Sequence, residues 1–125
     1  MAEGELVGTE QAEQPGQLSV VSTASEGIRV VTPTGEIDHH TGPTLRQALD
    51  VTGATGPRVV VDMHGVSFMD STGINILIAA HRDLTAAGGW LRLAAPVHAV
   101  LRTIQIVGVD TVIDCHDTLA QALNA

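Results

Sequence analysis

The chain has 125 residues, which is enough for one domain built around a single hydrophobic core. Hydrophobic residues make up 44% of it, so the fold does not depend on disulfide or metal support. The net charge is −8 and only 2% of the residues are aromatic, which argues against nucleic acid or an anionic membrane as a partner. The chain contains no lysine, and this excludes Schiff-base chemistry and lysine-containing phosphate loops.

The ends and the cysteine content indicate where the protein works. A lone cysteine, Cys115, permits no internal disulfide and suits a reducing compartment. The acidic N-terminus is unlike a secretory signal, and no apolar run has the length of a transmembrane helix. We therefore expect a soluble, cytoplasmic protein with a disordered acidic tail over residues 1–16 and one domain over residues 17–125.

The middle of the chain alternates between strand and helix patterns. Segments with alternating or β-branched residues predict strands at 18–23, 28–37, 58–62, 90–94 and 112–113. Amphipathic spacing and capping residues predict helices from about 42 to 52, 72 to 87, 96 to 107 and 117 to 124. The fold class is therefore α/β, with a mixed, mostly parallel sheet of four to five strands and about four helices.

Several single residues refine this prediction. Pro33 cannot donate a ladder hydrogen bond and favours an edge strand or a bulge. Thr41 is typical of a helix N-cap, and Pro43 suits the first helical turn. Gly65 ends the valine strand, and Ser67 and Phe68 return the chain to the edge of the sheet.

Two polar segments, Asp38-His39-His40 and Asp70-Ser71-Thr72, each follow a predicted strand and precede a predicted helix. Sites in α/β folds gather at such positions, so the two segments are expected to share one face.

Four kinds of chemistry fit these segments poorly. The residues around Ser71 lack the G-x-S-x-G pattern of hydrolases, and adjacent histidines lack the spacing of helical metal ligands. A phosphoaspartate receiver would need a late-strand lysine, and no glycine-rich nucleotide loop is present. We therefore expect no catalytic residue, no metal and no cofactor.

Ser71 itself has two interpretations that sequence physics leaves open. It can be a phosphorylation site, because the N-terminus of a helix tolerates a phosphate. It can equally be a helix-capping residue with no other role.

The segments Gly35–Thr41 and Ser67–Gly73 resemble the two signature stretches of the bacterial anti-sigma factor antagonists. These are single-domain STAS proteins of sporulation and general stress control. The resemblance covers about residues 18 to 124 and implies a STAS-like fold without enzyme activity.

The resemblance also implies a partner switch. The unmodified protein binds an anti-sigma factor, a serine kinase of the histidine-kinase-like ATPase type, and a sigma factor is released. The kinase phosphorylates Ser71, with Thr72 as the fallback position, and binding is lost until a metal-dependent serine phosphatase restores it. The residues implied to contact the partner are Asp38, His39, His40, Thr41, Asp70, Ser71, Thr72, Gly73 and Asn75.

One residue departs from the pattern, since many relatives have glycine where this chain has Asn75. The departure bears on which kinase is recognised. The alternative function within the same family is a STAS scaffold or sensor in a larger signalling complex.

Overall fold

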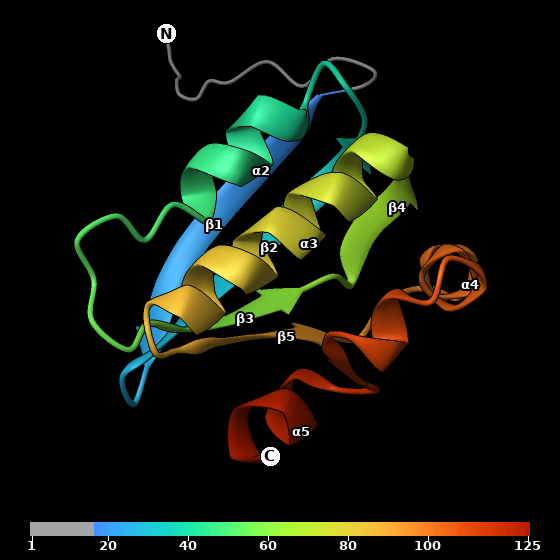
Figure 1. The fold of residues 1–125 in the computed structure, drawn as a ribbon. Helices are drawn as coiled ribbons and strands as arrows, with labels where there is room; N and C mark the ends of the chain where they lie inside the picture. The colour runs from blue at the N-terminus through green and yellow to red at the C-terminus, as the bar shows by residue number, and fades with distance from the viewer. Residues whose placement is uncertain (1–16) are drawn as a thin grey trace, which may run out of the picture.

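The computed structural model describes residues 17–125, and the tail predicted over residues 1–16 lies outside the described residues. Strands and helices alternate along the chain after an initial hairpin (Figure 1). The strands are β1 (Leu18–Ser25), β2 (Ile28–Ile37), β3 (Arg58–Asp62), β4 (Gly65–Met69), β5 (Trp90–Ala94) and β6 (Asp114–His116). The helices are α2 (Gly42–Ala48), α3 (Ser71–Ala86), α4 (His98–Ile106), the 3-10 helix η1 (Val109–Thr111) and α5 (Leu119–Asn124).

All six strands belong to one sheet with the order β1-β2-β3-β5-β6. β1 and β2 are antiparallel, and every other pair is parallel. β4 lies outside the linear order because it pairs with β2 beyond the end of β3. The structure thus confirms the mixed, mostly parallel sheet with four α-helices.

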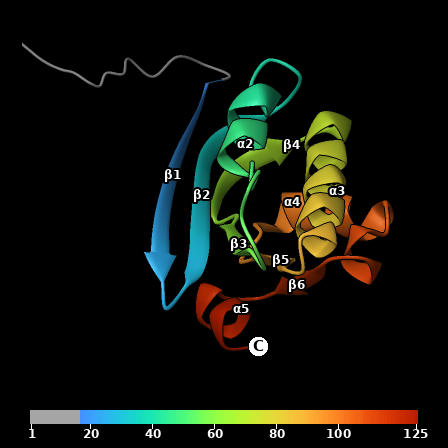
Figure 2. The same cartoon turned by 60° about the vertical axis from the view of Figure 1, so that its left-hand side comes forward.

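The helices cover the sheet unequally. α2 and α3 lie side by side on one face, whereas α5 packs against β3, β5 and β6 at the lower end (Figures 1 and 2). Alternate residues of a strand point to opposite faces. Val59 and Val61 accordingly enter the large core that contains Leu77 of α3, and Val60 enters the smaller cluster that contains Ala122 of α5.

Two predicted strands differ from the structure. Residues 65–69 form a full strand, β4, which the sequence suggested only as a return to the sheet. The last strand is Asp114–His116 and not Val112–Ile113. Ile113 is buried beneath the 3-10 helix, so its apolar character reflects core packing at that position and not the sheet ladder.

Pro33 lies in β2, an interior strand, so the predicted edge position is wrong. The ladder explains how proline is tolerated there. β2 pairs with β3 as far as Val31 and with β4 from Thr34, so Pro33 falls in the gap between the two partners. The irregularity of the ladder itself follows at Gly35 and Glu36, where the register with β4 shifts.

Candidate functional site

The two polar segments meet at one end of the sheet. β2 and β4 run parallel with Ile37 opposite Met69, so the residues that follow them, Asp38 and Asp70, emerge next to each other. The backbone N–H of Asp70 donates to the carbonyl of Ile37 at 3.2 Å and ties the two segments together. The prediction that the two segments share one face, made from their positions after strands and before helices, is thus confirmed.

The Asp38 carboxylate orders its own loop. Its Oδ1 accepts the backbone N–H of His40 at 2.9 Å and that of Thr41 at 3.1 Å. The hydrogen bond from the Thr41 backbone is the main reason that the pKa of Asp38 lies below its usual value, with further contributions from His40, the Thr41 hydroxyl and the charge of His39. Burial acts in the opposite direction and is outweighed.

Thr41 lies at the N-cap position of α2 as predicted, but its side chain does not cap the helix. Its backbone lies in the helical region, and its side chain makes no capping hydrogen bond. Instead, the buried Thr41 hydroxyl donates to the carbonyl of Glu36 at 2.7 Å and accepts the N–H of Asp38 at 2.9 Å. The hydroxyl therefore closes the loop back onto β2, while Pro43 occupies the first turn of α2 as expected.

α3 begins at Ser71 and is capped by Asp70, whose carboxylate accepts the N–H of Thr72 at 2.9 Å. The Ser71 residue is exposed, and Gly73 is buried in the first turn. A Cβ at Gly73 would overlap the Met69 side chain and would lie 2.8 Å from Ile37 Cγ2. Glycine is needed here because the helix start is pressed against the ends of β2 and β4.

The start of α2 is equally close to α3. A Cβ at Gly42 would lie 2.9 Å from Ile76 Cδ1 and 3.0 Å from Thr72 Cγ2. Thr72 thus turns its methyl group toward α2 and is partly buried, whereas Ser71 is exposed.

The remaining residues implied by the resemblance lie in the same loop and on the same helix. His39 and His40 are exposed, and their rings lie 4.4 Å apart between centroids, tilted by 33°. Asn75 is exposed one helical turn beyond Ser71, and residues four apart share a helix face. The fold brings together the two parts of the chain that contribute these nine residues, the Asp38 loop and the start of α3 with its cap.

Sequence reasoning missed two further features of this face. Phe68, paired with Glu36 at the end of β4, leaves 48% of its surface exposed. The sequence places Phe68 in the stretch Ser67–Gly73, but only the structure shows that its large apolar side chain faces outward.

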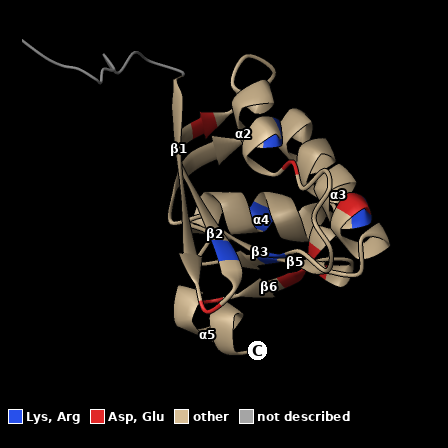
Figure 3. Ribbon diagram, turned by 90° about the vertical axis from the view of Figure 1, so that its left-hand side faces the viewer, with Lys and Arg blue, Asp and Glu red and all other residues tan. Residues whose placement is uncertain are grey.

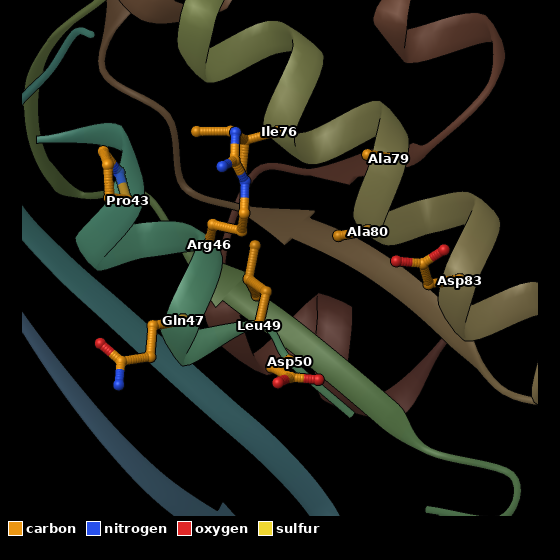
Figure 4. A pocket seen from close by; sticks show the side chains of 9 residues that line it. All are labelled: Pro43, Arg46, Gln47, Leu49, Asp50, Ile76, Ala79, Ala80 and Asp83. Atoms are coloured by element: carbon orange, nitrogen blue, oxygen red, sulfur yellow. The ribbon is translucent and has the colours of Figure 1, made fainter. Parts of the chain in front are cut away.

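The second missed feature is a groove of about 450 Å³ between α2 and α3 (Figure 4). It begins beside Pro43 and Ile76, next to the Gly42 contact, and it has an apolar floor. Arg46 extends along it toward Ile76, and Asp83 stands at the far end, opposite Asp50 (Figure 4). The lining residues are Pro43, Arg46, Gln47, Leu49, Asp50, Ile76, Ala79, Ala80 and Asp83.

The charges near Ser71 are acidic. Three acidic residues, Glu36, Asp38 and Asp70, lie in the stretches Gly35–Thr41 and Ser67–Gly73, and neither stretch contains an arginine. Elsewhere acidic and basic residues are interspersed over the side of the domain that Figure 3 shows. Four of the fourteen acidic residues lie in the first 16 residues, so the net charge of the whole chain overstates the acidity of the domain.

Groups that could support catalysis were sought around Ser71 in the described residues. Within residues 17–125, no hydrogen bond joins a histidine to the Ser71 hydroxyl; His64, for example, is bound to Asp62 of β3 at 2.8 Å. Over the same residues, no group of three or more metal-binding side chains gathers. In this described part of the chain no helix is both long and apolar enough to cross a membrane. The site is an exposed surface with the Ser71 residue at the start of a helix.

A family model for the STAS domain matches residues 19–122. The chain therefore belongs to the STAS domain family. It is 31% identical over 80 residues to the anti-sigma-B factor antagonist of Bacillus subtilis, a match that covers 64% of this chain and 73% of that protein.

Solved structures with a similar fold include anti-sigma factor antagonists. An anti-sigma factor antagonist from Mycobacterium paratuberculosis is 32% identical with a TM-score of 0.80, over 90% of this chain and 97% of that chain. The Bacillus cell fate determinant SpoIIAA in its phosphorylated form is 22% identical with a TM-score of 0.63, over 85% of this chain and 97% of that chain, and shows the same fold.

Proposed function

We propose that this protein is an anti-sigma factor antagonist that acts as a partner switch. In its unphosphorylated form it binds an anti-sigma factor, a serine kinase of the histidine-kinase-like ATPase type, and a sigma factor is thereby released. The observation that carries the proposal is the exposed Ser71 at the first residue of α3, beside the ordered Asp38 loop, in a STAS chain whose relatives are named antagonists.

Phosphorylation of Ser71 provides the switch. A phosphate adds about −1.5 to −2 charges at neutral pH. The N-terminus of α3 tolerates this charge because free N–H groups and the helix dipole favour an anion there, so the domain stays folded. The binding face already carries Asp38 and Asp70, and the added charge would have to be desolvated against the partner. We expect a loss of affinity of about a hundredfold or more.

The local packing favours Ser71 over Thr72 as the acceptor. Ser71 is exposed, whereas the Thr72 methyl is turned toward Gly42 between the two helices. Because Thr72 is the less exposed of the two residues, we expect a kinase to act on Ser71. A serine phosphatase that removes the phosphate from Ser71 would restore binding.

The docking surface extends beyond the hydroxyl. Phe68 offers an apolar anchor beside the loop, and the groove between α2 and α3 continues the same surface away from Ser71. Asn75 lies on the Ser71 side of α3, where it would help to select the kinase.

The test uses the anti-sigma factor kinase of the source bacterium, identified by capture on the Ser71→Ala variant. The purified kinase and ATP should place phosphate on Ser71 in the wild type, as mapped by mass spectrometry. Ser71→Asp should bind the kinase about a hundredfold more weakly than the wild type in a titration.

Thr72→Ala is the matched control, and it should still be phosphorylated and bound. Phosphate found on Thr72 alone, or unchanged affinity of Ser71→Asp, would contradict the switch. Elution of the native protein in a very large complex, and not in a small heteromer, would favour the scaffold alternative.

A further inference from the structure

β1 forms one end of the sheet, and its outer edge is long and open. Its eight residues pair with β2 in one continuous register, from Leu18 opposite Gly35 to Ser25 opposite Ile28. Among residues 17–125, no strand pairs with the other side of β1, which stands alone at the margin of the sheet (Figure 2). One row of its main-chain groups is therefore unpaired within the described domain.

The hairpin turn identifies which groups these are. Glu26 and Gly27 form a two-residue turn with φ of 51° and 81°, which places Ser25 and Ile28 in a hydrogen-bonded pair. Hydrogen-bonded and non-hydrogen-bonded pairs alternate in an antiparallel ladder. The outward N–H and C=O groups consequently belong to Leu18, Val20, Ser22 and Ala24.

β1 itself has none of the features by which an edge strand usually prevents pairing. Natural edge strands are short, bulged, or carry charges or proline. β1 contains neither a charge nor a proline, and its ladder shows no bulge. β6, at the opposite end of the sheet, is three residues long and begins with Asp114, so that end is protected as expected.

We propose that the outer edge of β1 pairs antiparallel with the β1 edge of a second copy of this chain. A two-fold axis through Val21 places Val20 opposite Ser22 of the partner and Leu18 opposite Ala24 of the partner. All four residues present outward groups, so each of these pairs exchanges hydrogen bonds. Val21, which is 58% exposed in the single chain, then meets its own copy on the axis in a non-hydrogen-bonded pair, where side chains lie closest.

The geometry leaves the proposed docking site free. The Ser71 end of the sheet adjoins the start of β1, because Leu18 is opposite Gly35. In an antiparallel pair the two Ser71 sites therefore lie at opposite ends of the assembly, and each remains open to its own partner protein.

The association should be weak and should depend on salt. Pairing through a single strand buries less than the roughly 1,200 to 2,000 Å² of a stable interface. Each copy also carries a net charge of −8, so the two copies repel each other at low ionic strength. We expect a dimer that grows with protein concentration and with sodium chloride.

Sedimentation equilibrium of the full chain tests the proposal. The wild type should form a dimer whose dissociation constant falls as sodium chloride is raised from 20 to 300 mM, through a Debye length that shrinks from roughly 20 Å to below 10 Å. Val21→Lys places two charges together on the axis and should weaken association at least tenfold. The matched control is Ile106→Lys, at an even more exposed residue of α4 (75%), and it should leave association unchanged.

A cross-link fixes the register. In a Cys115→Ser background, Val21→Cys should form an intermolecular disulfide under mild oxidation, because directly opposed residues of such a pair have the required separation. Thr23→Cys, two residues from the axis, should cross-link less.

Three results would overturn the proposal: a wild type that stays monomeric at millimolar concentration, an association that Ile106→Lys disrupts and Val21→Lys does not, or protected Val20 and Ser22 amides in a monomer. Circular dichroism of Val21→Lys verifies that it folds. None of these measurements involves the kinase, so their outcome is independent of whether Ser71 is a switch.

Discussion

At the scale of single residues, the site depends on side chains that hold the backbone in place. Asp38, Thr41 and Asp70 each bind main-chain groups at hydrogen-bond distance, and none needs a partner protein to do so. The face that surrounds Ser71 is therefore formed before binding, which reduces the ordering that association would otherwise require.

The lowered pKa of Asp38 predicts a pH dependence of stability. A carboxyl whose pKa is lower in the folded than in the unfolded state stabilises the fold fully above the unfolded value, about 3.9. This stabilisation is lost as the pH falls through the lowered folded value. The free energy of unfolding of Asp38→Asn, measured with urea between pH 2.5 and 7, should lie below that of the wild type at pH 6 and approach it at the acid end.

Glu26→Gln, in the distant hairpin turn, provides the comparison for that experiment. The difference in free energy of unfolding between Glu26→Gln and the wild type should not shrink toward low pH as the difference for Asp38→Asn does. A constant gap between Asp38→Asn and the wild type over the whole pH range would show that the carboxylate charge does not stabilise the loop.

Gly73 gives a second prediction at this scale. Alanine is a better helix former than glycine, by about 1 kcal/mol. At Gly73, however, the added Cβ would overlap Met69 and crowd Ile37 between the helix and the strands. We expect Gly73→Ala to lower the free energy of unfolding by about 1 to 3 kcal/mol in urea titrations.

Gly42→Ala is the informative comparison, because its Cβ would lie 2.9 Å from Ile76 Cδ1 and 3.0 Å from Thr72 Cγ2, and the end of the Ile76 side chain can shift. It should therefore cost less than Gly73→Ala. Equal stability of Gly73→Ala and the wild type would mean that the start of α3 is free to move away from the sheet.

At the scale of elements, α2 and α3 form the groove that continues the docking surface. Its far end carries Asp50 and Asp83, while Arg46 extends along the part nearer Ser71. Reversing the charge at the far end should affect a partner that lies along the groove. We expect Asp83→Arg to weaken kinase binding about fivefold, equivalent to about 1 kcal/mol, as measured by calorimetry.

The matched control is Asp114→Arg, at an acidic residue of β6 that is also exposed. This change alters the net charge by the same amount but lies away from both helices. If both variants lose affinity equally, the effect is due to net charge, and the groove is not part of the interface.

The sequence predicted the elements whose own residues determine them. The valines of β3 and the apolar stripe of α3 signal their structures without reference to neighbours. β4 was underestimated because Ser67 and Phe68 are both exposed in a strand of only five residues that exists through its pairing with β2. β6 was misplaced because its position depends on the register with β5, which local composition does not encode.

In the candidate site, too, features that depend on local sequence could be predicted, and features that depend on the folded loop could not. The convergence of the two segments could be inferred from their places after strands and before helices. The capping role left open for Ser71 is wrong, because Asp70 caps α3 and Ser71 is the first helical residue. The role of Thr41 could not be inferred, because its hydroxyl reaches back to Glu36, a contact that exists only once the loop has folded. The groove likewise requires the spacing of two helices that are far apart in sequence.

At the scale of the whole molecule, the fold separates two kinds of surface. The Ser71 face lies at the carboxyl ends of β2 and β4, and the open β1 edge runs along the side of the sheet. A modification on the first surface need not disturb the second. A STAS domain of this size can therefore offer a regulated contact and a constitutive one at the same time.

The residues of the Asp38 loop have two different roles, and this difference bears on the specificity of related signalling pathways. Asp38 and Thr41 hold the loop through backbone contacts, while the imidazoles of His39 and His40 lie exposed on the surface. Substituting these two histidines would change the side chains that a partner contacts without changing the loop that carries them. If such positions change after gene duplication, sister pathways built on one scaffold would become insulated from crosstalk while the proposed Ser71 switch is kept.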